Sequence, residues 1–79
     1  MSTAIKYFGM IAEKVGTAEE TIDFGVRTES IDLRNFFEVR YPALVGMTYQ
    51  IAINQEFVAA LEANLEVHEI ALLPPFAGG

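Results

Sequence analysis

The residues of this sequence whose types and spacing could do chemistry form its last segment, Leu73-Pro74-Pro75-Phe76-Ala77-Gly78-Gly79. Pro74 and Pro75 fix φ and favour an extended conformation, so we expect the segment to project from the body. Gly78 and Gly79 lack Cβ atoms, which lets the backbone enter a narrow channel and approach a reaction centre closely. The α-carboxyl of Gly79, with an ordinary pKa of roughly 3.3–3.7, is ionised at neutral pH. Because a carboxylate is a poor electrophile, reaction there needs prior activation, for instance as an acyl-adenylate made from ATP.

The alternative interpretation of a Gly-Gly ending is a frayed terminus that does no chemistry, since termini are often disordered. The whole ending favours a reactive arm, because a predicted strand leads directly into Pro-Pro and the sequence then stops on Gly-Gly. We therefore predict two parts, a folded domain over residues 1–73 and a flexible reactive tail over residues 74–79.

The composition excludes most other chemistries. The sequence has no cysteine, which excludes disulfides, thiolate metal sites and cysteine nucleophiles. Its one histidine, His68, cannot form a histidine-rich metal site and is interpreted as a surface residue. No nucleophile–base pair is visible either, so we expect no enzyme active site, no metal and no cofactor bound by the chain itself.

Length and charge restrict the class of partner. With 79 residues the chain can form one small domain with a thin core, and 52% hydrophobic residues argue against disorder. A formal net charge of −6 repels phosphate backbones, so we expect no nucleic acid and instead a basic protein surface. No apolar run reaches the roughly 20 residues that span a bilayer, and residues 1–6 lack a secretory pattern. A cytoplasmic location without membrane association is the expectation.

Apolar and polar residues in the first part of the chain alternate as in strands. The pattern predicts a strand over 5–10, a short helical turn over 10–15 that ends at Gly16, and a strand over 21–24 that ends at Gly25. Met10 and Met47 are interpreted as ordinary gap-fillers of the core.

One main helix is predicted over residues 30–41. Ser30 is a suitable N-cap, and Asp32 in the first turn suits the helix dipole. Pro42 is a stop signal. The apolar stripe that this helix would lay on a sheet consists of Leu33, Phe36, Phe37 and Tyr41.

Three further strand segments follow the helix. Residues 49–53 alternate, the polar turn Asn54-Gln55-Glu56 reverses the chain into a short strand at 57–58, and residues 69–73 form the last strand, which Pro74 ends. This order predicts an α+β domain in which one helix packs on one face of a mixed sheet, with the β-grasp (ubiquitin-like) architecture as the natural candidate.

The alternation also assigns side chains to the two faces of the sheet. The predicted helix-facing set is Ile5, Tyr7, Ile51, Ile53, Ile70 and Leu72. Phe8, Ala71 and Leu73 would then lie on the opposite face, which a one-helix domain leaves exposed, and Phe57 and Phe76 could extend this apolar patch. Exposed aromatic residues near a reactive tail indicate a protein interface. The alternative for Phe8 and Phe57 is a small second core beneath a loop.

The charged residues are interpreted as surface groups. Arg34 and Arg40 are placed on the polar face of the helix, and Asn54 is expected to shape its turn through local hydrogen bonds and a left-handed backbone. The residues expected to be solvated charges are Glu13, Glu19, Glu20, Glu62 and Glu66.

The ending 72–79 resembles that of the MoaD family, the small subunits of molybdopterin synthase within the wider MoaD/ThiS ubiquitin-like group. Ala52-Ile53-Asn54-Gln55 resembles the internal Asn-Gln turn of the family, and Ile5-Lys6-Tyr7-Phe8 with Glu13 and Val15-Gly16 resembles its start. The similarity is collinear over nearly the whole chain. The segment 66–69 departs from the family, since it lacks the glycine usual in that turn.

The resemblance implies a fold in which the first and last strands are adjacent and parallel, and a cycle carried by the tail. A MoeB-like adenylating enzyme would use ATP to activate Gly79, and a sulfur donor would convert the adenylate to a thiocarboxylate. Gly78 would provide clearance. The tail would then insert into a MoaE-like large subunit, in a heterotetramer, and give its sulfur to a pterin precursor to build the dithiolene of molybdopterin. The resemblance places Phe8, Phe57 and Leu73 at that interface, together with Pro74, Pro75 and Phe76 of the tail.

Three other functions share parts of this pattern. A sulfur carrier for thiamine, thiolated tRNA or a tungsten cofactor would use the same tail with a different acceptor. A protein modifier would form isopeptide bonds with lysines, and a plain binding module would have an idle tail.

Overall fold

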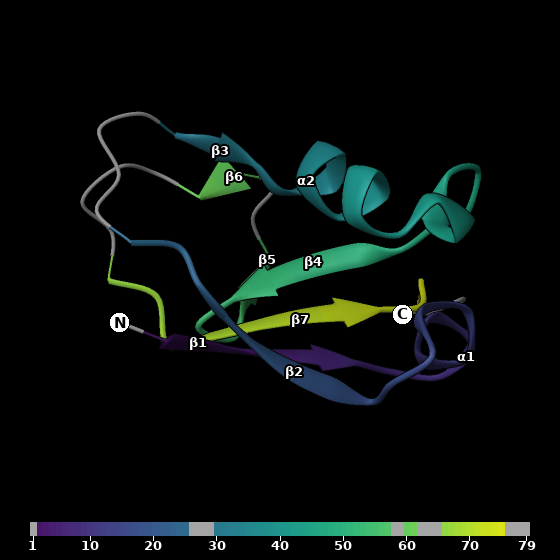
Figure 1. The fold of residues 1–79 in the computed structure, drawn as a ribbon, viewed down its shortest axis with the longest axis horizontal. Helices are drawn as coiled ribbons and strands as arrows, with labels where there is room; N and C mark the ends of the chain where they lie inside the picture. Colours follow the sequence, from purple (N-terminus) through teal and green to yellow (C-terminus); the bar gives the residue numbers. More distant parts are fainter. Residues whose placement is uncertain (1, 26–29, 58–59, 62–65, 76–79) are drawn as a thin grey trace.

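The computed structural model describes residues 2–25, 30–57, 60–61 and 66–75, and within them the chain forms a mixed sheet covered on one face by a helix (Figure 1). The strands of this sheet lie in the order β2-β1-β7-β4-β5. Their bounds are β1 (Ser2–Tyr7), β2 (Glu19–Asp23), β4 (Gln50–Ile53), β5 (Glu56–Phe57) and β7 (Glu69–Leu73). The other elements are α1 (Met10–Val15), α2 (Leu33–Arg40), the 3₁₀ turn η1 (Pro42–Leu44), and the two short strands β3 (Ile31–Asp32) and β6 (Ala60–Leu61).

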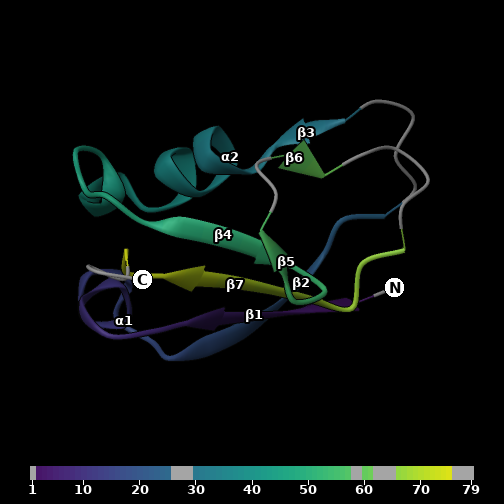
Figure 2. The ribbon, with the colours of Figure 1, turned by 180° about the vertical axis from the view of Figure 1, so that it is seen from behind.

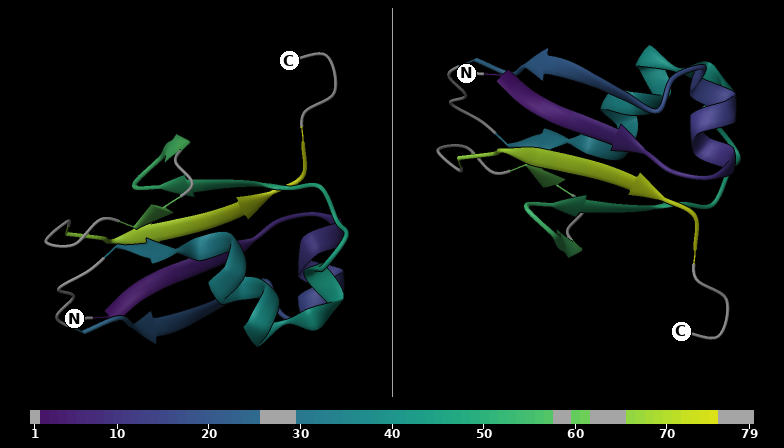
Figure 3. Two further views of the ribbon diagram at one scale, coloured as in Figure 1. Left: turned by 90° about the horizontal axis from the view of Figure 1, so that it is seen from above. Right: turned by 90° about the horizontal axis from the view of Figure 1, so that it is seen from below.

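The first and last strands lie side by side at the centre of the sheet. β1 and β7 are parallel, with Ile5 opposite Ile70 and Tyr7 opposite Leu72. β2 and β4 flank them in antiparallel pairs. This is the β-grasp architecture that the sequence predicted, and α2 lies across the sheet as its main helix (Figure 3, left).

The core lies between α2 and the sheet. The six strand residues predicted to face the helix are all buried, and Leu33 and Phe37 of α2 are fully buried opposite them. The rings of Tyr7 and Phe37 meet edge to face, with centroids 6.2 Å apart. The period-2 pattern therefore assigned the inward face correctly.

β1 starts and ends earlier than the predicted strand over 5–10. Gly9, with φ of +58°, turns the chain, so that Met10 begins α1 instead of continuing the strand. α1 ends where expected, because Gly16 adopts the left-handed conformation and its N–H donates to the Ala12 carbonyl. Met10 is 62% exposed and so is no core gap-filler, whereas Met47 packs against the core.

The predicted N-cap Ser30 is wrong. Asp32 caps α2, since its Oδ1 accepts a hydrogen bond from the backbone N–H of Asn35 at 3.2 Å. The physical reason is that Ile31 and Asp32 pair with β6 and are thereby held extended, which delays the helix to Leu33.

The turn between β4 and β5 is a two-residue hairpin. Asn54 and Gln55 both have positive φ, +49° and +71°, as in a type I′ turn, and Ile53 pairs with Glu56 across it. The Asn54 side chain also reaches the chain before β7. Its Oδ1 accepts from the N–H groups of His68 and Glu69, and its Nδ2 donates to the Glu66 carbonyl. Asn54 therefore fastens the start of β7 as well as shaping its own turn.

Glu20 is not the solvated charge that the sequence suggested. Its carboxylate accepts hydrogen bonds from the hydroxyls of Tyr7 and Tyr41 and from Arg40, whose Nη2 lies 2.6 Å from Oε1. Partial burial alone would raise the pKa of this carboxyl, but the hydrogen bonds outweigh it and lower the pKa to about 2. Burial, reinforced by the carboxylate, raises the pKa of Tyr7. The cluster joins β1, β2 and the end of α2.

Candidate docking surface and tail root

The tail leaves the molecule from the end of its central strand. β7 lies between β1 and β4, and its last residues are held on both sides: the Phe8 N–H donates to the Leu72 carbonyl at 3.1 Å, and Leu73 pairs with Gln50. Pro74 is half-buried and Pro75 is exposed. The predicted site residues Phe76, Gly78 and Gly79 lie outside the described residues, so their roles stay predictions, as does the division into domain and tail.

Gly9 fixes the position of the first proline. A Cβ added at Gly9 would lie 3.1 Å from Cγ of Pro74, and φ at Gly9 is in the region that L side chains rarely adopt. The corner between β1 and α1 thus packs closely on the root of the tail. Gly9 was not among the predicted site residues, although a glycine between a predicted strand and a predicted helix was a usable signal.

The sheet face opposite α2 is open in the part of the chain that the structure describes, and β1, β7 and β4 lie in front when this face is viewed (Figure 3, right). On it Phe8 is 43% exposed and Phe57 is 64% exposed, while Leu73 is half-buried. These exposures contradict the alternative in which Phe8 and Phe57 form a second core. They leave large apolar side chains available for an interface.

Ala71 was predicted to be exposed on this face, and that prediction is wrong: it is 7% exposed. The cause is its central place, because Ala71 pairs with Lys6 on one side and with Ala52 on the other, and Ala52 in turn pairs with Phe57. The small side chains of Ala52 and Ala71 lie between larger side chains and are covered by them. Lys6 also forms a salt bridge with Glu69, with 3.1 Å between Nζ and Oε1, so this part of the open face is charged.

Further apolar side chains gather where the tail leaves. α1 and η1 lie at that end of the molecule (Figure 1), and Met10 at the start of α1 and Val45 just after η1 are 62% and 63% exposed. Neither was predicted to be part of the site. They add exposed apolar side chains at the end of the molecule where β7 ends.

Two kinds of arrangement are absent from the described residues, a metal-binding cluster and a membrane-spanning helix. There, no three His, Cys, Asp or Glu side chains gather in a way that could hold a metal ion. The same residues include no helix long and apolar enough to cross a membrane. The described residues provide a defined point at which the chain leaves the sheet after β7, and an apolar surface beside that point.

Comparisons with known proteins agree over the length of the chain. The model of the ThiS family matches residues 5–79. A Caenorhabditis briggsae protein named molybdopterin synthase sulfur carrier subunit is 34% identical over 100% of this chain and 99% of its own length. The Homo sapiens protein of the same name is 34% identical over 95% of this chain and 91% of its own.

Solved structures show the same fold. SAMP1 from Haloferax volcanii superposes with a TM-score of 0.71 at 26% identity and covers 100% of both chains. A putative molybdopterin converting factor subunit 1 from Pyrococcus furiosus gives a TM-score of 0.72 at 19% identity, over 96% of this chain and 99% of its own.

Proposed function

The chain belongs to the ThiS family, and from this membership we propose that it is the sulfur-carrier subunit of a molybdopterin synthase. The relatives with this name align with 95% to 100% of the chain at about one-third identity. The observation that carries the proposal is the arrangement at the tail root, where the central strand β7 runs directly into Pro74 and Pro75, with Pro75 exposed.

The proposed chemistry takes place on the carboxylate of Gly79. An oxygen of this carboxylate attacks the α-phosphate of ATP on a MoeB-like adenylating enzyme, and pyrophosphate leaves. A sulfur donor then supplies hydrosulfide, which attacks the acyl carbon; AMP leaves, and a thiocarboxylate remains. In the MoaE-like large subunit the thiocarboxylate sulfur bonds to a carbon of a pterin precursor, whose oxygen substituent leaves, and water then hydrolyses the acyl–sulfur bond and regenerates the carboxylate. The acids and bases of these steps belong to the partners, because the chain supplies only the carrier.

The open apolar surface is proposed to dock on the large subunit of a heterotetramer. Phe8, Phe57 and Leu73 would form the contact on the sheet, and Pro74, Pro75 and Phe76 would enter with the tail. Large exposed aromatic side chains are the residues that most often carry binding energy at interfaces. The absence of side chains at Gly78 and Gly79 would matter most where the tail enters a narrow channel of the large subunit.

The proposal is tested by supplying the carrier in its loaded form. The chain is released from an intein thioester with sulfide to give the Gly79 thiocarboxylate, and hydrolysis gives the matched carboxylate control. We expect the loaded chain, mixed with a molybdopterin synthase large subunit and the pterin precursor, to yield dithiolene while its own mass falls to that of the control. Retention of the sulfur beside a large subunit that works with another carrier would contradict the proposal, and sulfur delivery to a thiazole or tRNA acceptor would assign a different pathway.

A further inference from the structure

The ring of Pro74, the first proline after β7, packs against the bare backbone of Gly9. A Cβ added at Gly9 would lie 3.1 Å from Cγ of this ring and 3.9 Å from its Cδ. The shorter distance is below the optimal separation of two carbon atoms, about 3.5–4.0 Å. Pro74 therefore occupies part of the space that a side chain at position 9 would need.

This contact distinguishes Gly9 from the other described glycines with positive φ. Apart from adjoining residues, nothing lies within 4 Å of a Cβ built on Gly16, Gly25 or Gly46. The positive φ alone is enough to explain a glycine at those three positions. At Gly9 there is a second requirement, which is room for the ring of Pro74.

Backbone hydrogen bonds hold the corner that carries Gly9. On the side of the sheet, the Phe8 N–H donates to the Leu72 carbonyl of β7 at 3.1 Å. On the side of α1, the Phe8 carbonyl accepts from the Ile11 N–H at 3.1 Å, and Ile11 is only 1% exposed. The corner is therefore tied to the central strand and, through α1, to the core.

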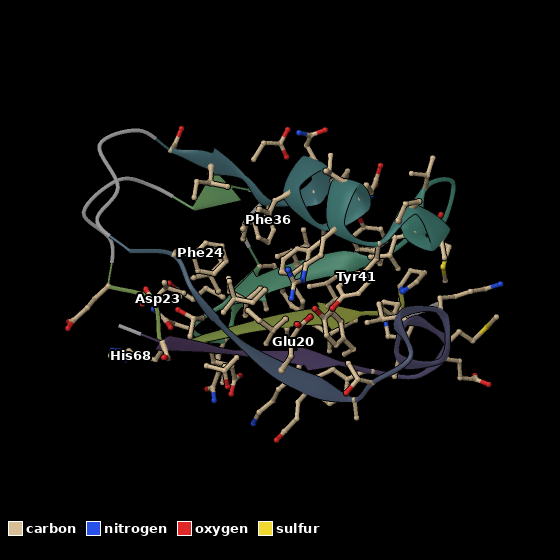
Figure 4. All side chains as sticks on the ribbon, viewed as in Figure 1. Glu20, Asp23, Phe24, Phe36, Tyr41 and His68 are labelled. Carbon is tan, nitrogen blue, oxygen red and sulfur yellow. The ribbon has the colours of Figure 1, made fainter. Side chains whose placement is uncertain are left out.

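The strand that leads into this corner is held by a side chain as well. The Tyr7 hydroxyl donates to the Glu20 carboxylate, which also accepts from the Tyr41 hydroxyl. Figure 4 shows Glu20 and Tyr41 next to one another between β2 and α2. The rings of Tyr7 and Tyr41 meet edge to face, with centroids 5.8 Å apart. A shift of β1 to make room at Gly9 would disrupt this cluster.

Pro74 has fewer contacts to lose than the corner. It has no N–H, so it donates no backbone hydrogen bond. It is half-buried, and Pro75 after it is exposed. A side chain at Gly9 should therefore displace Pro74, and the displacement changes the direction in which the chain continues past β7.

We propose that Gly9 is a positioning residue for the reaction of the tail, because the room it leaves for Pro74 sets the direction in which the chain leaves the sheet. The inference rests on the proposed function, in which Gly79 meets the reacting groups of its partners. Such reactions depend on orientation, and a misplacement of about 1 Å can lower a rate about a hundredfold. Gly9 touches no reacting atom and acts only through Pro74.

The test measures thiocarboxylate formation on the full chain with ATP, a MoeB-like adenylating enzyme and a sulfur donor, over a range of carrier concentrations. Gly9→Ala should lower kcat about tenfold and leave KM nearly unchanged, because the docking residues Phe8 and Phe57 are retained. Gly25→Ala is the matched control, since φ is +64° at Gly25 and +58° at Gly9. It introduces the same backbone strain without the contact to Pro74 and should leave both constants unchanged.

A double-mutant cycle shows whether the effect passes through Pro74. Pro74→Ala removes Cγ and Cδ, the two atoms that face Gly9, and should itself lower kcat because the ring no longer sets the direction. Adding Gly9→Ala to Pro74→Ala should then cause no further loss of kcat. The backbone strain at Gly9 remains in the double variant, so a role in stability alone would not give this result.

The outcomes separate this inference from the proposed function. If the unchanged chain stays unloaded beside an adenylating enzyme that loads another carrier, the proposed function is wrong and the positioning role falls with it. If the unchanged chain is loaded, and Gly9→Ala and Gly25→Ala are loaded equally fast, only the positioning role is wrong. Additive losses in the double variant would also overturn it. If Gly9→Ala does not fold, an unchanged kcat of Pro74→Ala is the overturning result.

Discussion

The two ends of β7, which can be followed in Figure 2, differ in the groups that surround them. At its start, polar groups fasten the strand: Asn54 binds the backbone of Glu66, His68 and Glu69, and the buried Thr3 hydroxyl donates to the Val67 carbonyl at 3.0 Å. At its end the large side chains are apolar: Phe8, whose N–H donates to the Leu72 carbonyl, is 43% exposed, and Leu73 is half-buried. The strand is therefore held by polar contacts at its start and bordered by exposed apolar side chains at its end, where Pro74 follows.

Under the proposed function, this difference separates the end of β7 that holds the strand in the fold from the end that presents the tail to partners. The fastened start holds β7 in register, and the register fixes the point and direction at which Pro74 leaves the sheet. Under the proposed function, partners recognise the apolar end of β7 and meet the tail root, Pro74, at a constant place. Changes at the reacting end should alter chemistry or binding without altering stability, and changes at the fastened end should do the reverse.

The largest effect is expected from lengthening the tail. One tryptophan added after Gly79 should abolish thiocarboxylate formation and sulfur transfer, because the carboxylate is displaced and a bulky side chain is placed where clearance is needed. Circular dichroism should show an unchanged fold. The matched control adds the same residue before Met1. Cofactor synthesis supported by the lengthened tail would refute the carrier hypothesis.

The next largest effect is expected on the open face. Phe57→Ser should weaken binding to the large subunit by about tenfold to a hundredfold, measured by calorimetry, because an exposed aromatic contact is lost. Its unfolding free energy should change by less than about 0.5 kcal/mol, since Phe57 is 64% exposed. Val39→Ser, on the other side of the molecule, is the control. If both variants bind equally well, the interface is misplaced.

Substitutions at the start of β7, which polar contacts hold, should change the stability of the fold. Asn54→Ala removes hydrogen bonds to three backbone groups and should lower the free energy of unfolding by about 2 kcal/mol, measured in urea. Gln55→Ala, in the same turn and also at positive φ, should change it by less than about 0.5 kcal/mol. Folded Asn54→Ala protein should still form a thiocarboxylate. If the Asn54→Ala protein is as stable as the unchanged chain but forms no thiocarboxylate, the proposed division of roles between the two ends of β7 is wrong.

A smaller, pH-dependent effect is expected at the Glu20 cluster, which joins the edge strand β2 to β1 and to the end of α2. The folded pKa of about 2 is below the ordinary value of 4.5, so this carboxylate stabilises the fold above pH 4.5, and the contribution is lost as pH falls toward 2. We expect a loss of about 2 kcal/mol over that range, after a discount for solvent screening. Glu20→Gln should flatten this part of the stability profile and Glu19→Gln should not. If the stability profiles of the Glu20→Gln and Glu19→Gln variants are equal, the Glu20 cluster does not cause the loss of stability at low pH.

Local signals allowed most of the fold to be predicted from the sequence. The bounds of β7 were predicted as observed, because alternation ends directly at Pro74, and Gly16 and the Asn54-Gln55 turn have strong backbone preferences. The cap of α2 was assigned to the wrong residue because Ser30 and Asp32 are both good caps. Only the distant pairing of β3 with β6 decides between them.

The candidate site was predictable where it depends on alternation. Phe8 was assigned to the open face for that reason, and Phe57 was added to it because of its place near the turn. The burial of Ala71 instead depends on the neighbours that three other strands supply. The same holds for Glu20, whose partners come from β1 and from the end of α2, and for Gly9, whose role depends on its contact with Pro74. Contacts between remote segments have no signature in a single sequence.

The most direct test of the central claim is the intact mass of the chain after incubation with ATP, a MoeB-like adenylating enzyme and a sulfur donor. We predict a gain equal to the replacement of one oxygen by sulfur, dependent on ATP and absent from a chain that lacks Gly79. An unchanged mass beside an adenylating enzyme that loads another carrier would contradict sulfur carriage by this chain.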